Sequence, residues 1–170
     1  MKNIVLIGFM GVGKTTTGQL ISEKLSVAFF DTDKIIEQTT DMSVSELFEK
    51  LGEKEFRKYE TEVVNLLSNA EGCVISCGGG IVLNKKNIDL LSKNGIIIYL
   101  KASIDTIVKR ISSDKTRPII AAMENPKKEI ELLFNKRKNF YENNNFSLDV
   151  DSLTPDEISD KIINAVKDIL

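Results

Sequence analysis

Short apolar runs alternate along the chain with longer stretches of helical character. Five of these runs are mostly apolar, which is typical of strands covered on both faces in a parallel sheet. They lie at residues 3–8, 27–31, 73–77, 95–100 and 146–150. Because helical stretches separate them, the pattern predicts an α/β fold with three layers and a five-stranded parallel sheet in the middle.

Capping residues mark where several helices should begin. A serine or threonine followed three residues later by glutamate can form a capping box, and proline is favoured at the first helical position. The chain offers Ser43 with Glu46, Asn125 with Pro126, and Thr154 with Pro155 and Glu157. We expect helices to start at these three places.

A glycine-rich segment follows the first predicted strand and leads into a helical stretch. Residues Gly8–Thr15 read G-F-M-G-V-G-K-T, which fits the phosphate-binding pattern G-x-x-x-x-G-K-[ST] in its strand-loop-helix context. Gly8, Gly11 and Gly13 allow the backbone N–H groups to surround a phosphate, with the helix dipole behind them. The segment therefore predicts a P-loop, although a glycine-rich turn that happens to carry a lysine is the simpler alternative.

The polar residues of this loop predict ATP and Mg²⁺ as cofactors. Lys14 would reach the β- and γ-phosphates, and the hydroxyl of Thr15 would hold Mg²⁺. The expected ATP contacts in the loop are Gly11, Val12, Gly13, Lys14, Thr15 and Thr16.

Chain length and one aperiodic segment define the expected domain organisation. The 170 residues fit a single P-loop domain, 1–170, that is long enough to bury a core. Segment 112–125 has no clear period and carries the run Lys115–Pro118 between two helices. In a P-loop protein such a connection is a candidate lid, and an ordinary surface loop fits the pattern equally well.

Charge and cysteine content exclude several other classes of protein. A formal net charge of -2 gives no global basic field for nucleic-acid binding. The longest apolar run outside the P-loop region, Ile96–Leu100, is far too short to span a membrane. With only Cys73 and Cys77 and no histidine, neither a disulfide framework nor a zinc site is expected. We expect a cytoplasmic monomer that acts on a small molecule, with both cysteines reduced and buried.

Arginine is rare in this chain. Of 23 basic residues, only Arg57, Arg110, Arg117 and Arg137 are arginine. An arginine fork can pair bidentately with a carboxylate or phosphate, which lysine cannot do. Arg57 lies on a predicted helix between the second and third strands, on the side where an acceptor substrate would approach the γ-phosphate. Arg117 lies in the candidate lid, and Arg137 lies one helix later. Arg110, near a helix end, is expected to line the nucleotide base or to interact with the helix C-terminus; ordinary ion pairing is the alternative for each.

Acidic and glycine residues follow the second and third predicted strands. Alternation along an extended segment would point Asp31 and Asp33 the same way, one to support Mg²⁺ and one to orient and deprotonate a hydroxyl. The alternative is that either residue merely caps the next helix. Gly78–Gly80 would let a compact polar substrate approach the backbone closely, whereas a tight turn rarely needs three glycines.

Six segments together resemble the shikimate kinase family in order and spacing, across essentially the whole chain. The resemblance implies a nucleoside-monophosphate-kinase-like P-loop fold with a lid. It also implies ATP-dependent phosphorylation of the 3-hydroxyl of shikimate to shikimate 3-phosphate, in chorismate and aromatic amino acid biosynthesis. The segments are Gly8–Thr15, Asp31–Asp33, Phe56–Glu60, Gly78–Gly80, Thr116–Pro118, and Arg137 with Tyr141.

The resemblance also implies roles for individual residues. Asp33 resembles the residue that holds the shikimate hydroxyls and serves as a base, and Arg57 and Arg137 resemble the pair that clamps its carboxylate. Gly79 resembles the glycine that contacts the substrate, and Arg117 resembles the lid arginine on ATP. The predicted catalytic residues are Lys14, Asp33 and Arg117, and the predicted substrate-binding residues are Asp33, Arg57, Gly78, Gly79, Gly80 and Arg137.

The chain departs from the family pattern in two places. Asn139 stands where the family often has proline, and Leu153 lies where many members place an arginine on the adenine. Adenine contacts are therefore expected to rest on the backbone, Arg110 and Pro155.

Other functions fit parts of the same pattern. A kinase of another hydroxylated acid such as gluconate, a nucleoside-monophosphate kinase, and a non-catalytic nucleotide-binding switch are the alternatives. A nucleotide acceptor would need a base pocket, and gluconate lacks the cyclic rigidity that suits the triple glycine. A switch would turn ATP over slowly even with shikimate.

Overall fold

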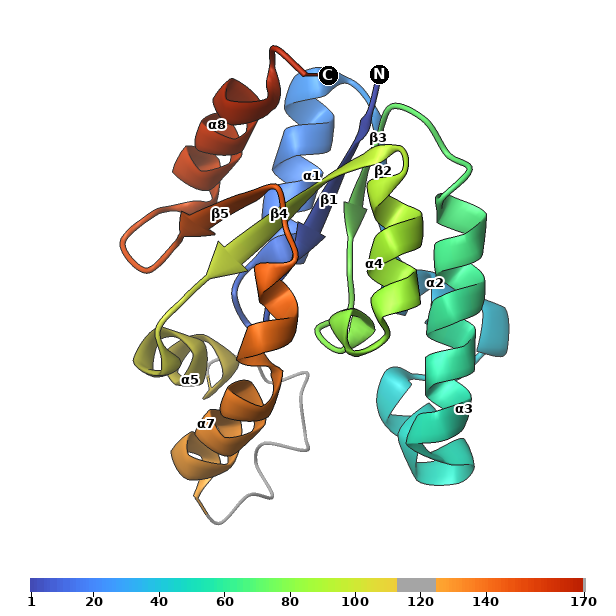
Figure 1. Cartoon of the computed structure of the whole chain (residues 1–170). Coiled ribbons are helices and arrows are strands. Elements are labelled where there is room, and N and C mark those ends of the chain that lie inside the picture. Colours follow the sequence, from blue (N-terminus) through green and yellow to red (C-terminus); the bar gives the residue numbers. More distant parts are fainter. Residues whose placement is uncertain (113–124, 170) are drawn as a thin grey trace.

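The computed structural model describes residues 1–112 and 125–169, and a five-stranded parallel sheet lies at its centre (Figure 1). The strand order is β2-β3-β1-β4-β5. Each predicted strand is confirmed to within one residue at either end. The strands are β1 (Asn3–Ile7), β2 (Ala28–Asp31), β3 (Cys73–Ser76), β4 (Gly95–Lys101) and β5 (Phe146–Asp149).

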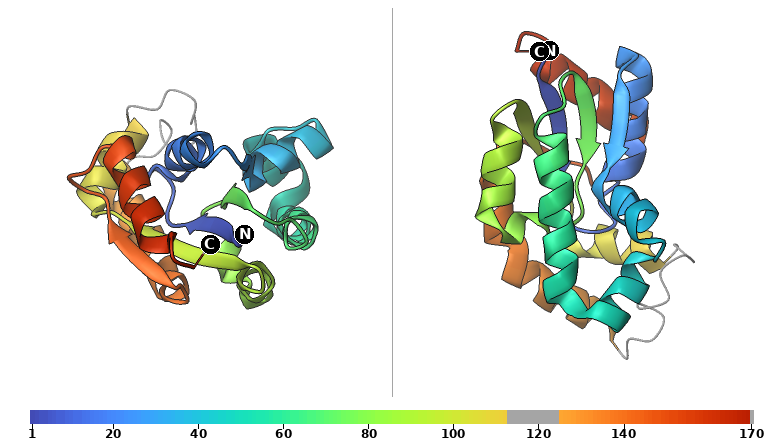
Figure 2. Two further views of the ribbon diagram at one scale, coloured as in Figure 1. Left: turned by 90° about the horizontal axis from the view of Figure 1, so that it is seen from above. Right: turned by 90° about the vertical axis from the view of Figure 1, so that its right-hand side faces the viewer.

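Helices cover both faces of the sheet, so the three predicted layers are present (Figures 1 and 2). One face carries α1 (Lys14–Leu25) and α8 (Pro155–Val166). The opposite face carries α3 (Val44–Leu67) and α4 (Lys85–Ser92). The other helical elements described are α2 (Thr32–Thr40), α5 (Ile104–Ser112), α7 (Pro126–Arg137) and the 3-10 turns η1 (Ile81–Leu83) and η2 (Lys138–Glu142).

Burial of the central strand explains its apolar sequence. Every residue of β1 is buried, and Val5 lies in register with Ile75 of β3 and Ile97 of β4. A helical layer on each face favours apolar side chains in β1, and its one polar residue, Asn3, is hydrogen-bonded to Ala70 and Cys73. Because all five strands are parallel, their carboxyl ends meet at one edge of the sheet, where ligands bind in such folds.

The predicted helix starts are confirmed. Two capping boxes are formed, one at the start of α3 and one at the start of α8, and an asparagine caps α7. These caps are Ser43 with Glu46, Thr154 with Glu157, and Asn125.

A kink divides α3. Gly52 has φ 80° and ψ 166°, a conformation in which glycine meets no Cβ penalty. The second part of α3 therefore begins at Glu53, and Arg57 and Glu60 follow on its first turns. Within residues 1–112 and 125–169, no helix is long and apolar enough to cross a membrane.

Residues 113–124 lie outside the described residues. They include Arg117 and nearly all of the predicted lid at 112–125. The lid and the contact of Arg117 with ATP stay predictions.

Candidate active site

The P-loop joins β1 to α1, as the sequence predicts. Gly11 and Gly13 have φ angles of 80° and 97°, a left-handed backbone that other residues rarely adopt. Gly13 is the N-cap of α1, so the first N–H groups of the helix face the loop. The loop and the helix start together form an anion-binding site.

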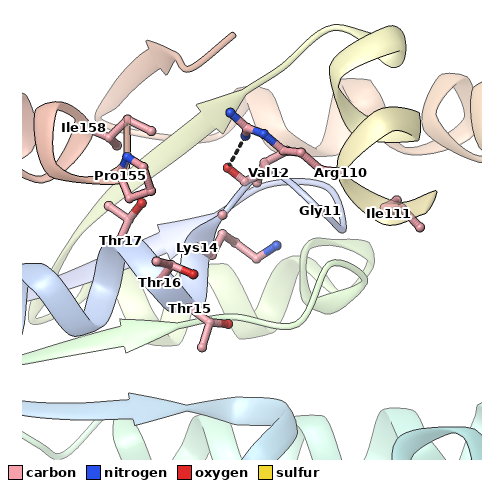
Figure 3. Close-up of a pocket in the computed structure, with 11 residues that line it drawn as sticks. Gly11, Val12, Lys14, Thr15, Thr16, Thr17, Arg110, Ile111, Pro155 and Ile158 are labelled. Carbon is pink, nitrogen blue, oxygen red and sulfur yellow. Dashed lines mark hydrogen bonds between the residues drawn. The ribbon is translucent and has the colours of Figure 1, made fainter. Parts of the chain in front are cut away.

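A pocket of about 510 Å³ lies against this loop (Figure 3). It collects every predicted nucleotide-binding residue except Arg117, which lies outside the described residues. Thr17, Ile111 and Ile158 also contribute to it and were not predicted. The lining residues are Gly11, Val12, Gly13, Lys14, Thr15, Thr16, Thr17, Arg110, Ile111, Pro155 and Ile158.

Lys14 places a positive charge inside the loop. Its Nζ donates hydrogen bonds to the carbonyl oxygens of Gly8 and Phe9, at 2.8 and 2.9 Å. The residue is buried, and Figure 3 shows its ammonium group close under the loop that carries Gly11. A buried ammonium beside a helix N-terminus favours a phosphate there.

Arg110 ties the P-loop to the far side of the pocket. Its Nη1 donates to the Val12 carbonyl at 3.0 Å, which Figure 3 shows as a dashed line, and its Nη2 donates to the Val150 carbonyl at 3.1 Å. Val150 directly follows β5, from which the chain continues to Pro155 on the pocket wall. The arginine therefore lines the predicted nucleotide pocket while bracing two of its walls.

The predicted metal site brings together three oxygen-bearing side chains. The Thr15 hydroxyl donates to Asp31 Oδ2 at 2.8 Å and lies 3.4 Å from Ser76 Oγ. Such oxygen ligands suit Mg²⁺, which binds through one or two carboxylates plus substrate phosphates. Asp31 Oδ1 also accepts hydrogen bonds from the backbone N–H groups of Asp33 and Lys34. Asp31 thus caps α2 and faces Thr15 at the same time.

The extended geometry predicted for Asp31–Asp33 is wrong. α2 begins at Thr32, directly after β2, so Asp33 lies in the first helical turn. Its side chain still reaches the carboxyl end of β3, because a Cβ added to Gly78 would collide with the carboxylate of Asp33. Helical geometry, and not strand alternation, places Asp33 there.

Gly78–Gly80 make room for three different neighbours. A Cβ on Gly78 would meet Asp33, and one on Gly80 would meet the guanidinium of Arg57. A Cβ on Gly79 would lie 3.3 Å from the backbone nitrogen of Met10 in the P-loop. The three glycines therefore bring the predicted hydroxyl-binding acid, the phosphate loop and the predicted carboxylate-binding arginine around one short segment.

Tyr141 anchors this segment from behind. Its hydroxyl donates to the Gly79 carbonyl at 2.6 Å, and its ring stacks on Tyr99 with centroids 5.0 Å apart. The side chain is fully buried, and burial raises the pKa of the phenol while the nearby charge of Arg137 opposes that rise. Arg137 therefore lies close to the same segment, at the end of α7.

Arg57 is held by two carboxylates and two aromatic rings. Its Nη1 donates to Glu60 Oε2 at 2.6 Å, while Nη2 and Nε donate to Glu53 Oε1 at 2.7 and 3.2 Å. The guanidinium carbon lies 5.9 Å from the Phe48 ring centroid and 5.4 Å from that of Phe56. These contacts fix the arginine beside Gly80.

Glu60 is the buried partner in this group. It is 1 % exposed, and burial raises its pKa to about 7, with the charge of Asp33 adding to the rise and those of Arg57 and Arg137 opposing it. Its Oε1 has no hydrogen-bond partner within the described part of the chain. A carboxyl group of this kind fixes the position of Arg57 at a cost in desolvation.

Sequence reasoning did not assign a role to Glu60, Ser76 or Glu53. The spacing i, i+3 from Arg57 to Glu60 and i, i+4 from Glu53 to Arg57 could have suggested helical ion pairs. Burial of Glu60 and the approach of Ser76 to Thr15 depend on packing between distant elements. Both cysteines are free and buried, as predicted.

The comparisons with known proteins agree with one another. The family model described as "Shikimate kinase" matches residues 10–167. A shikimate kinase of Thermodesulfovibrio yellowstonii is 45 % identical over 96 % of this chain and 94 % of its own. One of Caldanaerobacter subterraneus subsp. tengcongensis is 47 % identical over 97 % and 96 %. The structure of shikimate kinase from Acinetobacter baumannii in complex with shikimate has a TM-score of 0.92 at 32 % identity, covering 99 % of this chain and 94 % of that one.

The raised pKa of Glu60 predicts a pH-dependent contribution to stability. Between its unfolded value of 4.5 and about 7, the folded state binds more protons at this site than the unfolded state. The free energy of unfolding of the wild type should therefore fall, relative to Glu60→Gln, as the pH rises through this window, by on the order of 1–3 kcal/mol. Urea unfolding of both proteins across this range measures the difference, and a difference that is constant or grows with pH contradicts the assignment.

Proposed function

The chain belongs to the shikimate kinase family and catalyses the ATP-dependent phosphorylation of shikimate, and we propose which of its residues carry out each part of the transfer. The reaction belongs to aromatic amino acid biosynthesis. The observation that carries the proposal is the meeting of Asp33, the P-loop backbone and Arg57 around Gly78–Gly80. That arrangement sets a phosphate-binding loop beside groups that suit a hydroxylated carboxylic acid.

On the donor side, we propose that the pocket along the P-loop binds ATP. Backbone N–H groups of the loop and of the start of α1 would bind phosphate oxygens, with Lys14 adding positive charge. Thr15 and Asp31 would hold Mg²⁺, which would offset the negative charge of the phosphates. Arg110 and Pro155 would flank the base.

On the acceptor side, Arg57 and Arg137 would bind the carboxylate of shikimate. A guanidinium presents two parallel N–H groups to a carboxylate, and Glu60 keeps Arg57 oriented for that contact. Gly79, which packs against the P-loop backbone at Met10, would contact the ring of the substrate through its own backbone. The substrate is thereby held against the donor site, which lowers the entropic part of the barrier.

Asp33 would orient the 3-hydroxyl of shikimate and accept its proton during the transfer. Its carboxylate lies against Gly78, and its charge acts on Glu60, the buried partner of Arg57. A positioned carboxylate of this kind aligns the attacking oxygen with the phosphoryl group. Arg117 in the predicted lid would stabilise charge on the phosphoryl group, and closure of that lid would exclude water.

An acceptor panel tests the function and its alternatives. With ATP and Mg²⁺ present, ADP release should depend on shikimate and be far slower with quinate, gluconate or a nucleoside monophosphate. A coupled assay of ADP measures all four acceptors at equal concentration. Faster release with gluconate or a nucleotide would support another kinase, and slow release with every acceptor would support the non-catalytic switch.

Arg57→Lys tests the carboxylate clamp. One ammonium cannot reproduce the bidentate contact, so the KM for shikimate should rise about ten-fold or more, while the KM for ATP changes little. Steady-state kinetics with each substrate varied separately gives both values. A wild-type KM for shikimate would remove Arg57 from the clamp.

Asp33→Asn tests the role of the carboxylate as a base. The amide keeps the size of the side chain but cannot take the proton, so kcat should fall by about 10²-fold or more. Single-turnover measurements separate this step from product release. If kcat stays at the wild-type value, Asp33 acts only in positioning the substrate.

A further inference from the structure

The fork of Arg57 already holds a carboxylate that belongs to the chain itself. Nε and Nη2 form the edge of a guanidinium that pairs side-on with a carboxylate, and both donate to Glu53 Oε1. Nη1 is directed at Glu60 instead. Glu53 therefore occupies one of the two-donor edges that an acceptor carboxylate would use.

The two carboxylates on Arg57 differ in exposure. The side chain of Glu60 is 1 % exposed, whereas that of Glu53 is 58 % exposed. Removing Glu60 from its position would require repacking of the core, but Glu53 can turn into solvent. Exposed ion pairs are weak, so a second carboxylate can compete for the same donors.

Glu53 also experiences the second arginine of the proposed clamp. Its pKa is lowered by its hydrogen bonds with Arg57 and by the charges of Arg57 and Arg137, against the effect of burial. The kink at Gly52 places Glu53 at the start of the second part of α3, one turn before Arg57. At this position the carboxylate of Glu53 is close enough to interact with the positive charges of both Arg57 and Arg137.

We propose that Glu53 is an internal substitute for the acceptor carboxylate, which holds the fork of Arg57 until shikimate displaces it. The inference rests on the proposed role of Arg57 in binding that carboxylate. In the free enzyme, Glu53 keeps the guanidinium extended beside Gly80 and balances its charge. On binding, the substrate carboxylate takes Nε and Nη2, and Glu53 moves into solvent. Glu53 thereby sets the apparent affinity for shikimate without taking part in the phosphoryl transfer.

Glu53→Gln tests this exchange. Glutamine has nearly the same size but no charge, so the competition for Arg57 weakens and the KM for shikimate should fall about two- to five-fold, the size expected for an exposed ion pair. The KM for ATP should stay near the wild-type value, and kcat should change little because Glu53 has left the fork in the substrate complex. Glu55→Gln is the matched control: Glu55 is a partly exposed acid on the same helix that pairs with Lys58, and its loss should leave all three constants unchanged.

The methyl ester of shikimate provides a second readout. The ester is neutral, so it interacts only weakly with Nε and Nη2 of Arg57 even when Glu53 does not occupy them. Glu53→Gln should therefore improve the binding of the acid but not of the ester. Calorimetry without nucleotide measures both affinities. A crystal structure of the wild type with shikimate should show Glu53 beyond hydrogen-bond distance of Arg57. If Glu53 has only a structural role, Glu53→Gln should change the affinity for the acid and for the ester by the same factor.

Two results would overturn the proposal. An unchanged or higher KM for shikimate in Glu53→Gln, with thermal unfolding like that of the wild type, would show that Glu53 does not compete or instead supports Arg57. Glu53→Ala, which removes the side chain beyond Cβ, excludes a residual hydrogen bond that Arg57 could donate to the glutamine oxygen. If Arg57→Lys raises the KM while both Glu53 variants leave it unchanged, the clamp stands and only the exchange fails; if Arg57→Lys has no effect, the proposed clamp itself fails.

Discussion

Close approach at Gly78–Gly80 is the constraint on which the site depends. Each glycine faces a different partner, and a single added Cβ would push away Asp33, the P-loop backbone or Arg57. Glycine in such a segment loses more backbone entropy on folding than any other residue. The P-loop follows β1 and Gly78–Gly80 follow β3, and the pairing of these two strands holds the two segments next to each other.

Electrostatics at the acceptor end follow from burial. Glu60 is almost fully enclosed, so burial raises its pKa, and the charges of Arg57 and Arg137 only partly oppose that rise. Buried ion pairs seldom add much stability, since desolvation opposes their attraction. Here the buried ion pair fixes a position. Glu60 accepts a hydrogen bond from Nη1 of Arg57, which fixes the plane of the guanidinium, and the Nε and Nη2 edge then faces the more exposed side.

The sequence predicts the sheet well and the acceptor site less completely. Strands buried on both faces are mostly apolar, so runs such as Ile4–Ile7 and Ile96–Leu100 can be recognised as strands from the sequence alone. The extended conformation predicted for Asp33 is wrong because a helix begins at Thr32, where the side-chain oxygen of Asp31 caps the first turn. Propensity alone does not show at which residue a strand yields to a helix.

The contacts of Arg57 show a second limit of sequence reasoning. Helical spacing indicates that Glu53 and Glu60 can both reach it, but not that one is buried and the other exposed. That difference arises from packing of α3 against α2 and α4, and from the break at Gly52. Chemically identical side chains thus acquire different roles through burial.

Donor and acceptor sites are joined by more than proximity. Gly79 packs on the backbone at Met10, and its carbonyl accepts a hydrogen bond from the hydroxyl of Tyr141, which follows Arg137 by one helical turn. Tyr141 in turn stacks on Tyr99 of β4, the strand beside β1. The chain of contacts therefore runs from the phosphate loop through one glycine to the turn that carries the second arginine. Because Tyr99 and Tyr141 are buried, close packing holds the P-loop in a fixed position relative to the end of α7 that carries Arg137.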